Sequence, residues 1–458
     1  MGAAEAIAAL VPLLGDRLTT ARAARAQHGQ NETWFPEALP DAVALPETTA
    51  EVSAILAAAH RHGCPVVAQG AGTALEGHHL AVRGGIVLDF ARMNRVLAVR
   101  PEDLNATVQP GLTREALNDA LRATGLFFPV DPGANASLGG MAATRASGTT
   151  AVRYGTMRDN VLALEAVMAD GTVIRTGSQA RKSSTGYDLT HLLVGSEGTL
   201  GILTELTLKL QGIPEAVSAA TCRFDTVEAA VNCVILTIQS GIPMARIELV
   251  DEMMARGFNT LMQAGLPEKP HLFVEFHGTP AGVAEQARTF GEIAAEFGAE
   301  GFRWTTRAED RTALWRMRHN AHHATGALEP GKRTLSTDVC VPISRLAEAV
   351  TGAQDDLRAL GLVATIVGHV GDGNFHCGVR FDPDDPAELA CVHRFTDRLS
   401  EAALRLGGTV SGEHGIGIGK QKYMAAEHGP ALAPMRAIKA ALDPRNILNP
   451  GKLLPVHD

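Results

Sequence analysis

The stretch FPVDPGANASLGG, residues 128–140, decides how the first half of this chain is interpreted. Similar glycine-rich loops lie on either side of it: QGAGTALEG at 69–77, ASG and YG within 146–155, and VGSEGTLG at 194–201. Glycine lets the backbone approach a phosphate closely and exposes successive N–H donors. One such loop is more typical of an ordinary turn. Four in the first half of the chain predict a large ligand that carries phosphate.

The loops also exclude two common cofactors. None has the form G-x-G-x-x-G, which is typical of Rossmann dinucleotide-binding folds. None is followed by Lys-Ser or Lys-Thr, as a Walker P-loop would be. NAD and ATP are therefore disfavoured.

The first half has an α+β pattern. Val52, Ile55, Leu56 and Ala59 share one face of a helix expected at 50–62, and a second helix is expected at about 113–124. Residues 161–175 predict a hairpin with a type I′ turn at Asp170-Gly171.

After about residue 215, strands alternate with long amphipathic helices. Strands are expected at 218–224, 246–250, 271–277, 302–305, 335–341, 363–370 and 375–381, and helices at about 226–239, 281–297, 309–326, 343–360 and 387–406. This order predicts an antiparallel sheet covered by helices on one face. The domains are then 1–214, 215–420 and a C-terminal segment, 421–458, that returns to the first.

Composition and charge narrow the class of protein. The 458 residues are 45% hydrophobic and 20% charged, with a net charge of −9, so nucleic acid is not an expected partner. No apolar run reaches the roughly 20 residues of a membrane span. The first 17 residues predict an amphipathic helix rather than an export signal, and the six scattered cysteines suit a reducing compartment. A cytoplasmic location is expected.

The segment HVGDGNFH, from His369 to His376, is the sharpest local motif. A two-residue turn at Asp372-Gly373 would place the two histidines directly opposite each other on one face of a hairpin. Cβ atoms of such pairs are about 4.5–5.5 Å apart. A single histidine here is more typical of a core or surface residue, but this pair predicts a site for one divalent cation.

A third ligand is expected from the segment SGEHGIG at 411–417, which contains Glu413 and His414. Two histidines and one carboxylate leave coordination positions open for a substrate. A glycine-rich loop with a chance acidic residue is the alternative interpretation. Zinc and manganese are the expected metals, and the ligand set does not choose between them.

The glycine loops together resemble the FAD-binding half of the vanillyl-alcohol-oxidase-type flavoproteins. Over almost the whole chain the sequence is similar to the FAD-linked D-lactate dehydrogenase (cytochrome-type) and D-2-hydroxyglutarate dehydrogenase family. The resemblance implies a two-subdomain FAD-binding domain and an antiparallel-sheet cap domain for substrate. It implies non-covalent FAD, because Thr73 stands where members with covalent flavin place a histidine.

The same resemblance implies a set of site residues. His414 would be the catalytic base, His369, His376 and Glu413 the metal ligands, and Arg318, His322 and Asn374 the substrate residues. The cofactor residues would be Gln69, Gly70, Ala71, Gly72, Thr73, Pro132, Gly133, Ser137, Gly139, Gly140, Ala143, Ser147, Gly148, Tyr154, Gly155, Gly195, Ser196, Glu197, Gly198, Ile202 and Asn449.

The expected reaction is oxidation of D-lactate or a similar short D-2-hydroxy acid to the 2-oxo acid. The 2-hydroxyglutarate branch of the family carries a lysine where this chain has Ser336, and no basic residue is expected on that strand, 335–341. A second carboxylate would then lack a partner, at a high cost in a closed pocket.

Several alternatives stay open from the sequence. The enzyme could be a D-2-hydroxyglutarate or glycolate dehydrogenase, a metal-dependent hydrolase or lyase without flavin, or a flavin-binding subunit of a larger complex. The electron acceptor could be a cytochrome, a quinone or an electron-transfer flavoprotein. A homodimer would be unsurprising.

Overall fold

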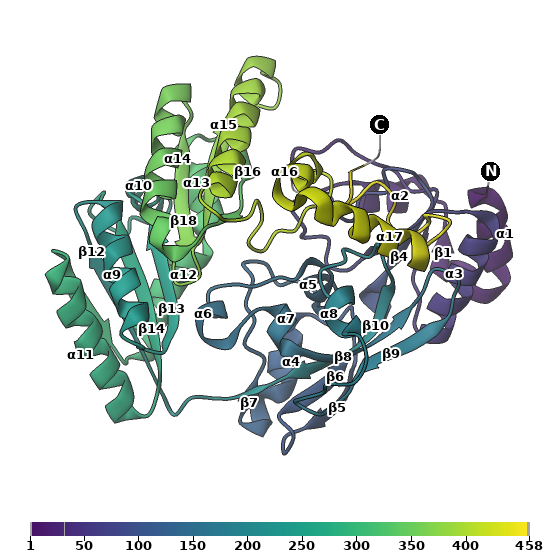
Figure 1. Ribbon diagram of the computed structural model, residues 1–458, viewed down its shortest axis with the longest axis horizontal. Helices are drawn as coiled ribbons and strands as arrows, with labels where there is room; N and C mark the ends of the chain where they lie inside the picture. Colours follow the sequence, from purple (N-terminus) through teal and green to yellow (C-terminus); the bar gives the residue numbers. More distant parts are fainter. Residues whose placement is uncertain (1, 32, 456–458) are drawn as a thin grey trace. The chain divides into compact units, whose positions relative to one another are not determined.

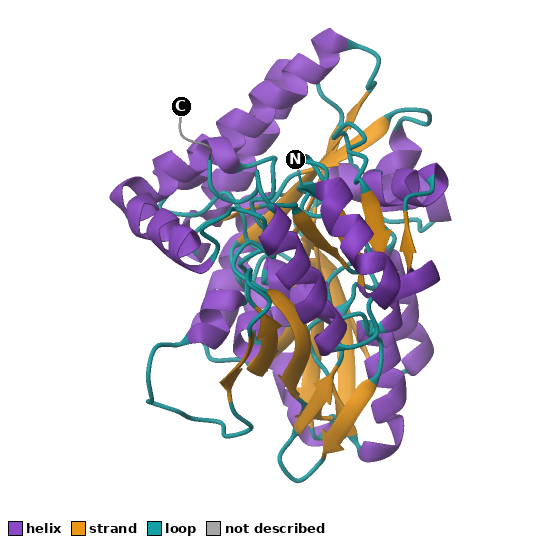
Figure 2. Cartoon of the chain, turned by 90° about the vertical axis from the view of Figure 1, so that its right-hand side faces the viewer, coloured by secondary structure: helices purple, strands orange, loops and turns teal. Residues whose placement is uncertain are grey.

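The computed structural model describes residues 2–31 and 33–455, and the chain divides into two compact units, each with helices and strands (Figures 1 and 2). Unit 1 comprises Met1–Ser147, Gly155–Ile213 and Glu413–Asp458, and unit 2 comprises Gly148–Tyr154 and Pro214–Gly412. The boundary expected at residue 420 therefore falls inside unit 1. Within the described ranges, no helix has both the length and the apolar character needed to cross a membrane.

Unit 1 contains a four-stranded sheet, a five-stranded sheet and a short strand pair. The first sheet has the order β1 (Leu18–Thr19), β2 (Ala42–Ala44), β4 (Ile86–Asp89), β3 (Val66–Gln69), and β2, β4 and β3 are parallel. The second has the order β5 (Val96–Arg100), β6 (Asn105–Val108), β10 (Ile202–Lys209), β8 (Val161–Val167), β9 (Val173–Gly177), and the pair is β7 (Leu126–Phe127) with β11 (Gln211–Gly212). The helices are α1 (Ala3–Leu14), α2 (Arg22–Gly29), α3 (Thr49–His62), α4 (Arg114–Leu121), α5 (Leu138–Thr144), α7 (Met157–Asn160), α8 (Leu189–Leu193), α16 (Met424–His428) and α17 (Leu432–Leu442).

The helix expected at 50–62 is confirmed as α3. The hydroxyl of Thr48 caps its start by accepting from the Glu51 N–H, and Gly63, with φ of 66°, ends it in the left-handed conformation. Its four expected core residues are buried.

The hairpin expected at 161–175 forms from β8 and β9, but its turn is not type I′. The Gly171 N–H donates to the Met168 carbonyl, and the Met168 N–H donates to the Thr172 carbonyl. A type I′ turn needs positive φ at both central residues. Here only Gly171, with φ of 93°, is positive, and the loop consists of the three residues Ala169, Asp170 and Gly171.

The C-terminal segment completes the first sheet of unit 1. Leu448 forms a parallel bridge to Val66, the first residue of the edge strand β3. The Val66 N–H donates to the Ile447 carbonyl, and the Asn449 N–H donates to the Val66 carbonyl. Ile447 and Leu448 are buried in the same hydrophobic core as α1 and α3. The tail therefore forms part of the core of unit 1.

Unit 2 is built on one antiparallel sheet of eight strands. Its order is β15 (Glu300–Thr305), β12 (Ala216–Arg223), β14 (His271–Gly278), β13 (Met244–Val250), β18 (Ala364–His369), β19 (Asn374–Phe381), β16 (Arg333–Ser336), and β17 (Val339–Cys340) also pairs with β19. The helices are α6 (Ala151–Tyr154), α9 (Val227–Gln239), α10 (Glu252–Met262), α11 (Pro280–Glu296), α12 (Ala308–His319), α13 (Ala321–Leu328), α14 (Leu346–Leu360) and α15 (Pro386–Arg405).

Helices cover both faces of this sheet, so the expectation of one covered face is wrong. Phe273 of β14 packs with α10, α12 and α13, whereas Phe276 of the same strand stacks edge-on against Phe290 of α11. Positions three apart on a strand point to opposite faces. Every residue from 271 to 277 is buried, which requires cover on both sides.

The hairpin of β18 and β19 carries the histidine motif with a register different from the expected one. His369 pairs with Asn374, and His376 pairs with Val367. The loop thus has four residues rather than two. The register differs from the expected one by two positions, and a strand has a side-chain period of two. Both histidines therefore remain on the same face of the sheet, as diagonal neighbours rather than directly opposed residues.

Replacing Gly373 by alanine is expected to lower the free energy of unfolding by at least about 2 kcal/mol. Gly373 has a φ of 78°, and a Cβ there would lie 2.0 Å from the Val341 carbonyl oxygen. Chemical denaturation of both proteins measures the loss. Gly352 is a helical glycine with no atom within 4 Å of the added Cβ, so Gly352→Ala is a matched control expected to be neutral or stabilising.

Candidate active site

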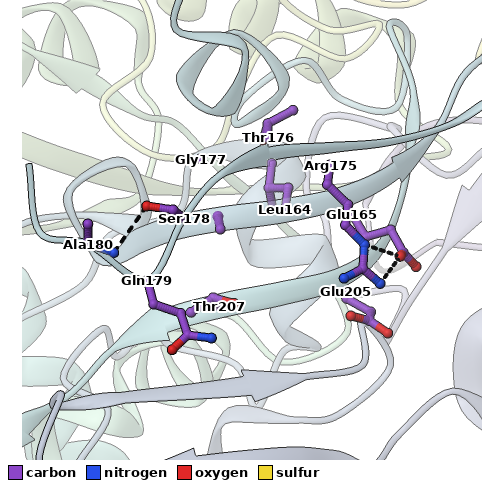
Figure 3. Close-up of a pocket in the computed structure, with 11 residues that line it drawn as sticks. Leu164, Glu165, Arg175, Thr176, Gly177, Ser178, Gln179, Ala180, Glu205 and Thr207 are labelled. Carbon is purple, nitrogen blue, oxygen red and sulfur yellow. Dashed lines mark hydrogen bonds and ion pairs between the residues drawn. The ribbon is translucent and has the colours of Figure 1, made fainter. Parts of the chain in front are cut away.

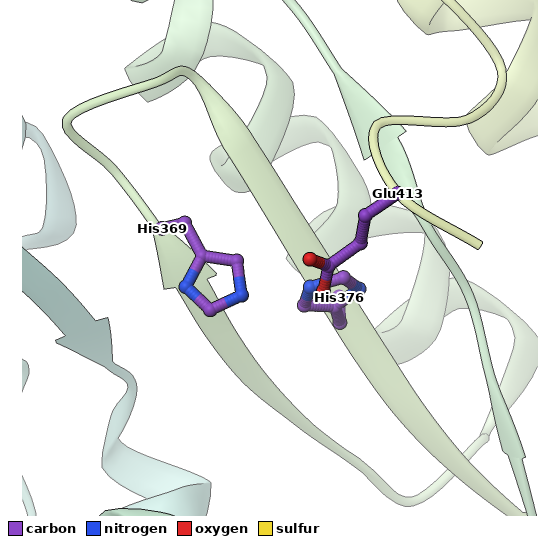
Figure 4. A group of neighbouring side chains, drawn as sticks. All are labelled: His369, His376 and Glu413. Carbon is purple, nitrogen blue, oxygen red and sulfur yellow. The ribbon is translucent and has the colours of Figure 1, made fainter. Parts of the chain in front are cut away.

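His369, His376 and Glu413 form a group suited to hold a metal ion (Figure 4). Each offers one ligand atom, and these atoms lie within 4.8 Å of one another. The imidazoles are buried, with ring centroids 5.4 Å apart. Glu413 follows directly after Gly412, the last residue of unit 2. The donor set, two imidazoles and one carboxylate, fits a divalent cation with open coordination positions.

Hydrogen bonds fix which nitrogen each imidazole presents. His369 Nδ1 lies 2.7 Å from Glu248 Oε1, and His376 Nδ1 lies 3.0 Å from the Thr337 carbonyl oxygen. A carbonyl only accepts hydrogen bonds, as does an ionised carboxylate, so each Nδ1 carries the proton. Each Nε2 therefore keeps its lone pair, which is the form that binds a metal.

Glu248 is a buried carboxylate that links the metal group to Arg318. Its side chain has no solvent exposure, and its Oε2 accepts from Nε of Arg318 at 2.9 Å and lies 2.8 Å from Nη2. Glu248 on β13 pairs with His369 on β18, so the two share a face of the sheet. One edge of the Arg318 guanidinium is thus already occupied, which leaves Nη1 for a substrate carboxylate.

Asn374 is also buried, and its amide is engaged within unit 2. Its Nδ2 donates to Asp338 Oδ1 at 2.7 Å and to the Val339 carbonyl at 2.8 Å, while its Oδ1 has no partner among the described residues. The Ser411 hydroxyl donates to the other oxygen of Asp338. Asp338 therefore ties the segment before Glu413 to the strand that carries His376.

His322 lies on a different helix from Arg318. It was expected one turn beyond Arg318 on the same helix, but α12 ends at His319 and α13 begins at Ala321. Asn320 separates the two helices, and His322 is exposed. Its ring lies beside that of His323, with the centroids 6.0 Å apart.

The first two glycine loops of unit 1 contact each other. A Cβ at Gly70 would lie 1.9 Å from Ser137 Oγ, so only glycine allows this approach. The Ala71 N–H donates to the same hydroxyl, and Gly72 has a φ of 73°. Gln69 Oε1 is buried without a partner among the described residues. The close backbone approach fits a phosphate-bearing cofactor, whereas Gln69 Oε1 is an acceptor that suits a donor group rather than a phosphate oxygen.

The loop at 194–201 packs against the end of α5. The Gly195 N–H donates to the Ala142 carbonyl, and the Glu197 N–H donates to the Ala143 carbonyl. Asn449 Nδ2 donates to the Glu197 carbonyl at 2.8 Å. Three glycine loops and the tail therefore meet around α5.

The other residues expected to bind the cofactor do not all lie in the glycine loops around α5. Ile202 lies with its side chain in the hydrophobic core of unit 1, so only its backbone could reach a cofactor. Gly148 and Tyr154 belong to unit 2, where the Tyr154 hydroxyl lies 2.7 Å from His277 Nδ1. Pro132 and Gly133 lie in the loop before α5, and Gly133 is exposed.

A groove with a volume of about 470 Å³ lies on the sheet of unit 1 formed by β8, β9 and β10 (Figure 3). Glu165, Arg175 and Glu205 are its charged residues. Nε and Nη2 of Arg175 donate to Glu165 Oε2. None of the residues expected to bind cofactor, metal or substrate lines the groove, so it is separate from the candidate site.

Two segments of the chain match known families. Residues 40–177 match an FAD binding domain, and residues 213–453 match the C-terminal domain of FAD linked oxidases. The chain belongs to the FAD-linked oxidase family, whose members are FAD-dependent oxidoreductases.

Curated relatives cover most of the chain. A probable mitochondrial D-lactate dehydrogenase of Danio rerio is 48% identical, covering 94% of this chain and 88% of the relative. A mitochondrial D-lactate dehydrogenase [cytochrome] of Arabidopsis thaliana is 44% identical over 99% and 80%. A glycolate oxidase subunit GlcD of Bacillus subtilis is 36% identical over 91% and 89%.

Solved structures confirm the expected vanillyl-alcohol-oxidase-type fold. The structure of p-cresol methylhydroxylase with substrate bound has a TM-score of 0.81 at 19% identity, covering 98% of this chain and 96% of that one. The expected family is confirmed by the curated relatives. The curated relatives also contradict the expected cytoplasmic location. The D-lactate dehydrogenases of Danio rerio and Arabidopsis thaliana are named as mitochondrial proteins.

Proposed function

We propose that this protein oxidises D-lactate to pyruvate with non-covalently bound FAD and one divalent cation, zinc or manganese. The observation that carries the proposal is the group His369, His376 and Glu413, directly followed in the chain by His414. The relatives named D-lactate dehydrogenase support the choice of substrate.

Each group of the proposed site would have one role in the oxidation of D-lactate. FAD, when bound, accepts the hydride that leaves Cα of the substrate. A cation on the two Nε2 atoms and Glu413 would lower the pKa of the substrate hydroxyl. His414, the neighbour of Glu413, would take the hydroxyl proton, since an imidazole titrates near neutral pH. Nη1 of Arg318 would hold the substrate carboxylate.

The specificity proposal follows from the faces of the sheet in unit 2. Ser336 pairs with Gly378 on β19, which is two positions from His376, so Ser336 lies on the metal face. Arg333 also lies on β16, contrary to the expectation that this strand has no basic residue. It pairs with Phe381, is exposed and points to the other face. The metal face of β16 therefore offers no cation to a second carboxylate.

The alternatives have weaker support. Glycolate fits the same groups, and a GlcD subunit is a relative, but at lower identity than the D-lactate dehydrogenases. A flavin-free hydrolase does not explain an FAD binding domain. We propose a cytochrome as electron acceptor, rather than a quinone or an electron-transfer flavoprotein, from the name of the Arabidopsis thaliana relative.

Anaerobic addition of D-lactate to the purified protein is expected to bleach the flavin absorbance within seconds. L-Lactate is expected to leave it unchanged, and a chelator should abolish the response until zinc or manganese is restored. The same measurement with D-2-hydroxyglutarate should give a kcat/KM at least about 10-fold lower than that for D-lactate, as expected when a buried carboxylate lacks a partner. Glycolate has no second carboxylate and serves as the comparison without this penalty. A flavoprotein that D-lactate does not bleach would overturn the proposal, and faster reduction by D-2-hydroxyglutarate would overturn the specificity.

A further inference from the structure

The turn that follows Glu413 and His414 is held by one buried carboxylate. Glu197 Oε1 accepts from the Ile416 N–H at 2.7 Å, and Oε2 accepts from the Gly417 N–H at 2.9 Å. All of these groups belong to unit 1. Both oxygens of Glu197 are therefore occupied by the backbone immediately after the proposed base.

His78 completes this arrangement. Its Nε2 lies 3.3 Å from Glu197 Oε2, and both side chains are buried. A Cβ at Gly415 would lie 2.7 Å from His78 Nε2 and 2.8 Å from Glu197 Oε1, so the backbone next to His414 rests directly on the pair. Burial raises the pKa of Glu197, but the charge of His78 and the bonds from the two N–H groups outweigh it, so the pKa is lowered and the carboxylate stays ionised.

The pair is itself held by the tail. Asn449 Nδ2 donates to the carbonyls of both His78 and Glu197, and Asn449 Oδ1 accepts from the ammonium group of Lys452. Glu197 and Asn449 both have positive φ, 55° and 41°. Such conformations cost non-glycine residues about 1–3 kcal/mol and persist where the surroundings over-determine them.

A separate contact holds Glu413 at the start of the turn, and a further one holds Gly417 at its end. The Ser147 hydroxyl donates to Glu413 Oε2 at 2.6 Å, and the Leu453 N–H donates to the Gly417 carbonyl. His414 thus lies between two anchored points. The hydrogen bond of Glu413 before it and those of Ile416 and Gly417 after it limit the directions in which the His414 imidazole can point.

We propose that Glu197, supported by His78, is a positioning residue that aims His414 at the substrate hydroxyl. The inference rests on the proposed function, because it takes His414 as the base. It adds a role to the expectation that Glu197 is a cofactor residue, since the backbone turn already uses both of its side-chain oxygens.

The test compares Glu197→Gln with the wild-type flavoprotein in two measurements. A glutamine can accept from only one of the two N–H groups. Amide hydrogen exchange of the peptide that covers 413–418 is expected to become at least about 10-fold faster. The rate of flavin reduction at saturating D-lactate is expected to fall on the order of 100-fold, the effect of a displacement of about 1 Å, with the substrate Kd within about 3-fold of the wild type.

Glu205→Gln is the matched control, because Glu205 lies on β10 of the same unit, in the groove apart from the candidate site, and is expected to change neither measurement. His78→Gln leaves both hydrogen bonds from the turn to Glu197 in place. It is expected to raise the exchange rate and lower the rate of flavin reduction less than Glu197→Gln does. This second variant tests the proposal if Glu197→Gln does not fold. Unchanged exchange, or loss of FAD with unchanged exchange, would overturn the proposal. If D-lactate fails to reduce the wild type, the proposed function fails, while the exchange measurement still tests the anchoring of the turn.

Discussion

Replacing His414 by asparagine is expected to lower the rate of flavin reduction by D-lactate by about 10²–10⁴-fold, the usual contribution of a positioned general base. Asparagine has a similar size but accepts no proton near neutral pH. The wild-type rate should rise with pH through the pKa of the base and then level, whereas the variant should lose this step. Anaerobic stopped-flow absorbance over a range of pH measures both effects.

His428→Asn provides the control for this variant. His428 ends α16 in the same unit, is partly exposed and is not one of the three residues of the metal group. The control should reduce its flavin at the wild-type rate. A His414→Asn protein with full FAD and metal content and an unchanged rate would show that another group takes the proton.

Replacing Glu248 by glutamine is expected to lower the free energy of unfolding by about 3–5 kcal/mol, because the variant leaves the charge of Arg318 buried and unpaired. Metal affinity should fall about 10–100-fold, because His369 loses the carboxylate that orients its ring. Chemical denaturation measures the first effect, and metal titration of the chelated protein measures the second.

Two further variants separate these effects. Glu300→Gln removes one partner of an exposed ion pair with Arg223 and is expected to cost less than about 1 kcal/mol. Glu248→Leu combined with Arg318→Met removes both buried charges and should regain most of the stability without regaining metal affinity. Wild-type metal affinity in the Glu248→Gln protein would contradict the role assigned to this carboxylate.

Much of the fold could be predicted because its signals are local. The apolar face of α3, its Thr48 cap and Gly63 lie within one short segment, and that prediction is confirmed. The prediction failed at two helices of unit 2, one of which has local signals as well. The helix α10 was not predicted, although Asp251 caps it and Met254 and Phe258 face the core, and α12 was expected to continue through Asn320.

The candidate site could also be predicted only in part. His369 and His376 could be placed together because both lie on one hairpin, even though its register was wrong by two positions. Glu248 lies 121 positions before His369 in the sequence, in a segment that reads as an ordinary strand. Its one signal was an acidic residue at a core position of that strand, where a buried charge needs a partner. No local pattern names that partner, because strand pairing creates the contact.

The position of Ile447 and Leu448 in the core of unit 1 has a consequence for the order of folding during synthesis. Strand β3 lies at the edge of its sheet, and the tail pairs with that edge through Leu448. At about 5–20 residues per second, a ribosome needs roughly 10–50 s after completing residue 213 to deliver this tail. The sheet of unit 2 lies within one continuous segment and can close first. We therefore expect unit 1 to complete its first sheet after the sheet of unit 2 has formed, with the edge of β3 open until residues 447–449 have been synthesised.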